Sequence, residues 1–215
     1  MVPRLWPDST IVCVGSGPSL TAADIVRCRL AGAKILAINN ACLLCAPLPD
    51  AIYAPDAQWW GWHPEALAAP CPKFAFQVEA RIYPDLTILN RTGYDGLERD
   101  PRGLRSGGHS GYAAINLAVH LGARTILLLG YDHGPADDGR HHFSGGDHPD
   151  GSHIPFAEIE EGPVANTYIH RDVYDSLVVP LAELEIDVIN VSRRSAITAF
   201  PVVPLPEVLR AACRV

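Results

Sequence analysis

Residues 11–20 read Ile-Val-Cys-Val-Gly-Ser-Gly-Pro-Ser-Leu, an apolar run that breaks into glycine, proline and serine. The valines and isoleucine are typical of a strand buried on both faces, as in a parallel sheet covered by helices. The two glycines allow positive φ and a close approach of a ligand to the backbone. Pro18 suits the first turn of a following helix, and Ser19 or Thr21 is a candidate cap for it. A strand, turn and helix start in this order favour a bound phosphate, whereas a turn without a ligand is the plain alternative.

This turn lacks the marks of two common nucleotide sites. Leu20 stands where the dinucleotide fingerprint has its third glycine, and the lysine of a phosphate-binding P-loop is absent. An NAD enzyme would also place an acidic residue after its second strand. The predicted second strand, residues 34–38, is followed instead by Asn39 and Asn40. The pattern therefore argues against a standard NAD site.

Composition indicates a globular protein with a substantial core. The chain has 215 residues, of which 48% are hydrophobic and 19% charged, and its formal net charge is −7. That charge gives no general attraction to nucleic acid. No apolar run approaches the roughly 20 residues of a membrane span, and the first residues lack a secretory signal, so a cytoplasmic location is expected. Cys42 and Cys45 have redox-motif spacing, but no second pair completes a zinc site.

Alternating apolar and polar segments predict the fold class. Strands are expected at 34–38, 51–54, 73–78, 86–89, 125–129 and 186–191, and helices at 21–31, 113–121 and 166–184, where Pro180 could kink or divide the last. The predicted architecture is one α/β domain over residues 1–215. It is Rossmann-like, with a mostly parallel sheet, helices on both faces and a polar loop or lid insertion at about 133–161.

Polar residues follow several of these predicted strands. They are Gly15, Ser16, Gly17, Pro18, Ser19, Asn39, Asn40, Asp56, Gly130, Tyr131 and Asp132. In open α/β sheets, ligands bind outside the carboxyl ends of the strands. We therefore expect these residues to lie along one edge of the sheet and to form a ligand site there.

Three other segments each have a functional and a structural interpretation. The loop at 133–161 is rich in His and Asp, so it is a candidate lid or metal site with Asp132, Asp147 and His148 as ligands, or else a polar excursion. The arginines at 99, 102 and 105 could clamp an anionic substrate or simply be solvated. The tryptophans in residues 58–64 form either a packing corner or a stacking surface.

Four blocks of the chain resemble a known group of proteins: residues 15–20, 39–40, 110–122 and 129–132. In the same order, they are similar to bacterial, archaeal and phage proteins that include the archaeal 6-hydroxymethylpterin diphosphokinase-like (MptE-like) family. They also resemble the bacterial sialyltransferases of glycosyltransferase family 42. Both resemblances imply nucleotide binding on a Rossmann-like fold in the cytoplasm of a bacterium or of a phage-infected host, and a homo-oligomer is compatible with them.

The resemblance to the sialyltransferases implies a nucleotide-sugar donor of the CMP type and a small-molecule or glycan acceptor. The residues that would contact the nucleotide are Gly15, Ser16, Gly17, Asn39, Asn40 and Ser110, and Gly130, Tyr131 and Asp132 match the family's Gly-x-Asp. His170 would be the general base on the acceptor hydroxyl, without a metal, and its imidazole suits that task at neutral pH. Two departures are that Ser16 replaces the family's asparagine and that its phosphate-binding tyrosines have no clear match in residues 133–150.

The resemblance to the diphosphokinases implies a different reaction. ATP would lie along the same edge with Mg²⁺ on Asp56 and Asp132, and its pyrophosphoryl group would pass to a hydroxymethyl oxygen of a pterin-like acceptor. A non-catalytic nucleotide-binding or phage-associated protein on this fold is the third hypothesis. We favour a glycosyltransferase-like enzyme with His170 and Asp132 as catalytic residues, because His170 matches the position of a base. A helix-end histidine bound to a backbone carbonyl is the structural alternative.

Overall fold

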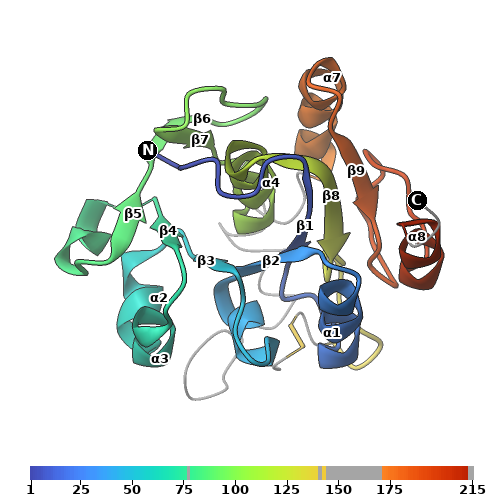
Figure 1. Ribbon diagram of the computed structural model, residues 1–215, viewed down its shortest axis with the longest axis horizontal. Coiled ribbons are helices and arrows are strands. Elements are labelled where there is room, and N and C mark those ends of the chain that lie inside the picture. Colours follow the sequence, from blue (N-terminus) through green and yellow to red (C-terminus); the bar gives the residue numbers. More distant parts are fainter. Residues whose placement is uncertain (77, 140–141, 144–170, 213–215) are drawn as a thin grey trace.

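The computed structural model describes residues 1–76, 78–139, 142–143 and 171–212. A seven-stranded sheet runs through the centre of the protein (Figure 1). In spatial order its strands are β5 (Leu86–Ile88), β4 (Lys73–Ala75), β3 (Ala51–Tyr53), β2 (Lys34–Ile38), β1 (Ser9–Val14), β8 (Ala123–Leu129) and β9 (Asp187–Asn190). Every neighbouring pair in this sheet is parallel.

Helices cover both faces of the sheet, which confirms the predicted single α/β Rossmann-like domain (Figure 1). On one face lie α4 (Ser110–Leu121) and α7 (Asp175–Glu183). On the other lie α1 (Ala22–Leu30), α2 (Ala57–Trp62), α3 (Pro64–Ala68) and α8 (Leu205–Ala212). Short 3₁₀ helices are η1 (Asn39–Leu44), η2 (Val78–Ile82) and η3 (Arg171–Tyr174). None of the helices in the described residues is long and apolar enough to cross a membrane.

The interior strand β1 is apolar because both faces of the sheet are covered there. Ile11 and Cys13 of β1 pack into the core beneath α4, whereas Val12 and Val14 pack into the core beneath α1. All four side chains are 0% exposed. Because alternate side chains of a strand point to opposite faces and both faces are covered, no position in this part of β1 meets water.

The order in which strands are added to the sheet reverses at β1. From β1 the chain proceeds to β2, β3, β4 and β5 on one side, and it later returns to β8 on the other side. The connections that follow β1 and β8 therefore leave the carboxyl edge of the sheet in opposite directions. In open α/β sheets this topological switch point is where ligands bind.

Some local expectations need correction. The helix predicted to begin at residue 113 begins at Ser110, and Pro180 lies inside α7 without dividing it. The glycine- and arginine-rich loop also contains a separate pair of parallel strands, β6 (Asn90–Gly93) and β7 (Gly103–Arg105). These strands are short and carry polar residues, so the hydrophobic pattern gave no sign of them.

Two of the three clustered tryptophans form a packing corner. Trp59 and Trp60 are buried in α2, with ring centroids 5.0 Å apart in an edge-to-face arrangement. Each indole N–H is satisfied: Trp59 donates to Asn40 Oδ1 at 2.7 Å and Trp60 to the Ala54 carbonyl at 3.1 Å. Neither ring is therefore presented as a stacking surface for a sugar or base.

Candidate functional site

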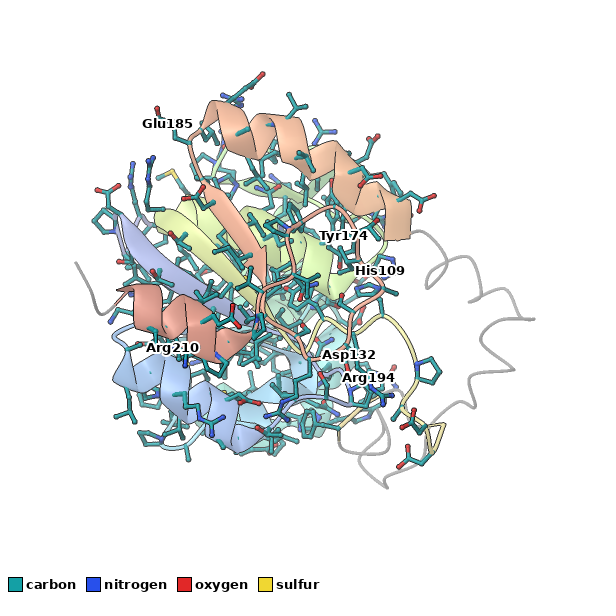
Figure 2. All side chains as sticks on the ribbon, turned by 90° about the vertical axis from the view of Figure 1, so that its right-hand side faces the viewer. His109, Asp132, Tyr174, Glu185, Arg194 and Arg210 are labelled. Atoms are coloured by element: carbon teal, nitrogen blue, oxygen red, sulfur yellow. The ribbon has the colours of Figure 1, made fainter. Side chains whose placement is uncertain are left out.

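A pocket of about 300 Å³ lies at the switch point, and we call it the switch-point pocket. Its walls come from segments far apart in the sequence: residues 15–17 after β1, residues 38–39 at the end of β2, residues 108–111 at the start of α4, and residues 130–134 after β8, with His142. Figure 2 shows His109, Asp132 and Tyr174 gathered at one end of the molecule, away from Glu185. The carboxyl ends of the strands thus meet in one cavity, as expected for an open parallel sheet.

The glycine turn is pressed against the end of β8. Gly15 N–H donates to the Leu129 carbonyl at 2.8 Å, and Gly17 N–H donates to the Gly130 carbonyl at 2.9 Å. A Cβ on Gly15 would lie 2.7 Å from the Gly130 carbonyl oxygen, and one on Gly17 would lie 2.6 Å from the same oxygen. Neither Gly15 nor Gly17 has the positive φ that the sequence allowed for them. Their lack of a side chain is required by the neighbouring strand.

Asp132 holds this turn in place. Its Oδ2 accepts a hydrogen bond from the Ser19 backbone N–H and its Oδ1 accepts one from the Ser19 hydroxyl, both at 2.8 Å. Burial raises the pKa of this carboxyl, and the two bonds from Ser19 and the charge of Arg194 act in the opposite direction. Asp132 lines the pocket, but both of its oxygens are used by the protein. This arrangement suits a positioning residue.

The N-terminus of α4 opens into the pocket. Ser110 and Gly111 line the cavity, and the backbone N–H groups of Ser110, Gly111 and Tyr112 have no backbone acceptor among the described residues. Such groups, together with the helix dipole, attract an anion. Asn39 bridges to this helix through its Nδ2, which lies 3.3 Å from the Ser110 hydroxyl. The Asn39 Oδ1 is buried and makes no hydrogen bond within the described part of the chain.

Backbone conformation around the pocket is unusual. Asn39 and His133 have φ of 49° and 50°, in the left-handed region that residues other than glycine rarely adopt. Gly108 and Gly130, which also line the pocket, have φ of 72° and 71°. The surrounding structure holds Asn39 and His133 in this conformation, whereas the two glycines adopt it without strain.

His109 and His133 line one wall of the pocket, with the buried Tyr174 packed against them, and sequence reasoning missed this cluster. The rings of His109 and His133 lie 5.0 Å apart, and His133 Nε2 lies 3.0 Å from the hydroxyl of the buried Tyr174. Burial raises the pKa of Tyr174, so its hydroxyl stays protonated and can donate to the imidazole. The available signal was position: His109 immediately precedes the helix start, and His133 immediately follows Asp132.

Several predicted site residues lie elsewhere. Asn40 is buried and accepts the hydrogen bond from Trp59, so its side chain supports α2. Pro18 and Ser19 belong to the turn but do not line the pocket, and Asp56 lines a neighbouring cavity. The other predicted residues that line the switch-point pocket are Gly15, Ser16, Gly17, Asn39, Ser110, Gly130, Tyr131 and Asp132.

Tyr131 is held by the protein on three sides. Its hydroxyl donates to the Gly111 carbonyl at 3.0 Å, its backbone N–H donates to the Ser192 hydroxyl, and its carbonyl accepts from the Ser195 hydroxyl. These contacts tie the end of β8 to the start of α4 and to the loop after β9. Like Asp132, Tyr131 therefore shapes the pocket by fixing its walls.

The arginine-rich loop does not reach the pocket. Arg99 pairs with Glu183 at 2.6 Å, Arg102 with Asp100 at 2.6 Å, and Arg105 approaches Glu98 at 3.7 Å. None of the three arginines lines the switch-point pocket. Their charges are neutralised locally, in mostly exposed pairs of small energetic value.

Three predicted residues, His170, Asp147 and His148, lie outside the described residues. Within the described part of the chain, no group of three or more His, Cys, Asp or Glu side chains could hold a metal ion. Burial raises the pKa of Cys42 and Cys45 to about 12, so neither thiol is poised to ionise at neutral pH.

The fold defines an open parallel α/β protein of the Rossmann-like type, with a pocket at the switch point. No known family model matches the chain, and a comparison with curated proteins found no matching sequence.

Proposed function

We propose that this protein is a nucleotide-dependent transferase, and that the switch-point pocket binds the phosphate-bearing part of the nucleotide. The observation that carries the proposal is the convergence of the glycine turn, Asn39 and the N-terminus of α4 on one cavity. A phosphate there would meet backbone N–H groups and the positive end of a helix dipole. These groups bind anions without a lysine or arginine, so the negative net charge of the chain is no obstacle.

The orientation of the nucleotide follows from the remaining polar groups. With phosphate at the start of α4, the unpartnered Oδ1 of Asn39 is a ready acceptor for a ribose hydroxyl or a base amino group. The resemblance to the sialyltransferases, in which the corresponding asparagine contacts a cytidine nucleotide, supports the same orientation. Asp132 and Ser19 would keep the turn in the shape that receives the ligand.

The reaction we favour is glycosyl transfer from a nucleotide sugar to an acceptor hydroxyl. It needs a base to take the acceptor proton and a group to stabilise the departing phosphate. His170 keeps the role of base in this proposal by resemblance. His109 and His133, which stand at the pocket wall, supply imidazoles suited to stabilising the departing phosphate.

The diphosphokinase hypothesis makes a different demand on the same pocket. There Asp132 and Asp56 would share Mg²⁺ with ATP, yet Asp132 already accepts two hydrogen bonds from Ser19, and Asp56 lines the adjoining cavity and not the switch-point pocket itself. The observed contacts of Asp132 therefore favour the glycosyltransferase-like proposal.

A titration of nucleotides by calorimetry tests the proposal. CMP, UDP and ATP, and the corresponding nucleotide sugars, would be titrated with and without Mg²⁺ into the wild type, Asn39→Ala and Asn90→Ala. Asn90 is exposed and lines neither the switch-point pocket nor its neighbour, so it is a matched control. We expect a cytidine or uridine nucleotide to bind without Mg²⁺, and Asn39→Ala to weaken binding about tenfold.

The other outcomes are equally definite. Binding of ATP alone, and only with Mg²⁺, would replace glycosyl transfer with the diphosphokinase reaction. Failure of every nucleotide to bind, or equal binding by Asn39→Ala and the wild type, would contradict a nucleotide at this pocket. If a nucleotide binds but no acceptor is ever modified, the protein is a binding module.

A further inference from the structure

A second cavity, of about 320 Å³, adjoins the switch-point pocket. The two cavities share Gly108, His109 and Ser110, so they meet at the start of α4. We call the second cavity the Tyr53 pocket after a residue in its wall. Its other walls are Pro55, Asp56, Phe76, Arg91 and Ser106. A molecule held here would lie next to the proposed phosphate of the nucleotide.

Tyr53 is the first feature that points to a ligand. The residue is 0% exposed, and its hydroxyl has no hydrogen-bond partner in the described part of the chain. A buried hydroxyl without a partner costs stability, and nearly all such groups in folded proteins are satisfied. The ring is fixed edge-on against Phe76, with centroids 5.9 Å apart, so the hydroxyl is held in one place.

Arg91 is the second, independent feature. Its Nε donates to the Ser106 hydroxyl at 3.0 Å, which fixes the side chain at the pocket wall. Unlike Arg99, Arg102 and Arg105 of the same region, it makes no ion pair with a carboxylate in the described residues. Its remaining N–H groups form a planar fork, a shape that binds a carboxylate through two parallel hydrogen bonds.

The two features point to the same acidic group of one ligand. We infer that the Tyr53 pocket binds a small organic carboxylate, with Arg91 and the Tyr53 hydroxyl on the carboxylate oxygens and Phe76 against its apolar body. This molecule would be the co-substrate that receives the transferred group, and that role rests on the proposed function. The presence of a carboxylate site does not depend on the proposed function.

Benzoate is a suitable probe because it joins a carboxylate to a flat apolar ring, and benzamide is its neutral counterpart. Binding of each would be measured by saturation-transfer NMR and by thermal shift to the wild type, Arg91→Gln, Tyr53→Phe and Arg102→Gln. Arg102 pairs with Asp100 and lies outside the pocket, so its variant is the matched control. All four proteins would first be checked for the same cooperative unfolding.

We expect benzoate to bind the wild type and Arg102→Gln about tenfold more tightly than benzamide does. In Arg91→Gln this preference should disappear. Tyr53→Phe should weaken benzoate binding several-fold while unfolding no earlier than the wild type, since it removes an unpaired hydroxyl. Absence of benzoate binding, equal binding of benzamide, or an unchanged preference in Arg91→Gln would each overturn the inference.

Nucleotide titrations of the same variants separate this inference from the proposed function. If a nucleotide binds all four proteins but benzoate binds none, the carboxylate site is wrong and the nucleotide pocket stands. If benzoate binds with the expected dependence on Arg91 but no nucleotide binds, the carboxylate site stands and the transferase proposal fails.

Discussion

The contact between the glycine turn and β8 can be tested with Gly130→Ala. Gly130 has a φ of 71°, and the left-handed conformation costs an alanine about 1–2 kcal/mol. The added Cβ would also lie 2.7 Å from the Gly15 carbonyl oxygen and 3.3 Å from the Leu20 Cβ. Overpacking of this kind costs about 1–3 kcal/mol. The two effects together predict a loss of about 2–5 kcal/mol in the free energy of unfolding.

Gly96→Ala is the matched control for the conformational part. Gly96 has a φ of 75°, but a Cβ there would have no neighbour within 4 Å, so only the cost of about 1–2 kcal/mol applies. Urea unfolding of both variants, followed by the fluorescence of the buried tryptophans, measures the difference. Gly130→Ala should be less stable than Gly96→Ala by about 1–3 kcal/mol. Equal stability of the two variants would show that the turn is not pressed against β8.

Three further predictions concern other parts of the molecule. Burial raises the pKa of Asp132, so the folded protein holds this proton more tightly than the unfolded chain, and the carboxyl's favourable contribution is lost as the pH rises. As the pH rises from about 4 to neutrality, the free energy of unfolding of Asp132→Asn should therefore increase relative to that of the wild type. Urea unfolding at several pH values measures this difference, and a difference independent of pH would contradict the prediction. Asn40→Ala should lose about 1–3 kcal/mol, because it leaves the Trp59 N–H unpaired, yet bind nucleotides as the wild type does; weakened binding would restore Asn40 to the site. In labelling resolved by peptide, Cys42 and Cys45 should resist alkylation until the protein unfolds, because burial raises the pKa of each to about 12, and rapid labelling of either in the folded protein would refute that.

The main strands and the parallel character of the sheet could be predicted, though not the strand order, because their signals are local. The apolar runs of β1, β2 and β8 each predict a buried strand by themselves. The regular alternation of strands with helices implies a parallel sheet. The polar residues after these strands could then be assigned to one edge. By contrast, β6 and β7 have only three or four residues and little apolar content, so nothing in their sequence separates them from a loop.

Individual roles at the site depended on contacts that no local pattern contains. Asn39 and Asn40 are adjacent and identical in type, yet Asn39 faces the pocket and Asn40 is bonded to a tryptophan in α2. The left-handed backbone of Asn39 accompanies this difference in orientation. Gly15 suggested a ligand in the sequence, whereas its smallness is required by Gly130, more than 100 residues away.

Other residues at the two pockets were missed because their roles also depend on contacts between distant segments. His109, His133 and Tyr174 come from three separate segments and are brought together only by the fold. Tyr53 reads as an ordinary strand residue, and its unpaired hydroxyl is a property of its surroundings. Chemistry that depends on such assembly can be recognised once the strands are in place.

The central claim is that a nucleotide binds where β1, β2, α4 and β8 meet. The most direct measurement is an amide NMR titration of the isotope-labelled protein with whichever nucleotide raises its melting temperature most. We expect the largest shifts at Gly17, Asn39, Ser110 and Gly111, with little change at Glu185 on the opposite end of the molecule. Shifts concentrated at any other surface, or none at saturating nucleotide, would contradict it.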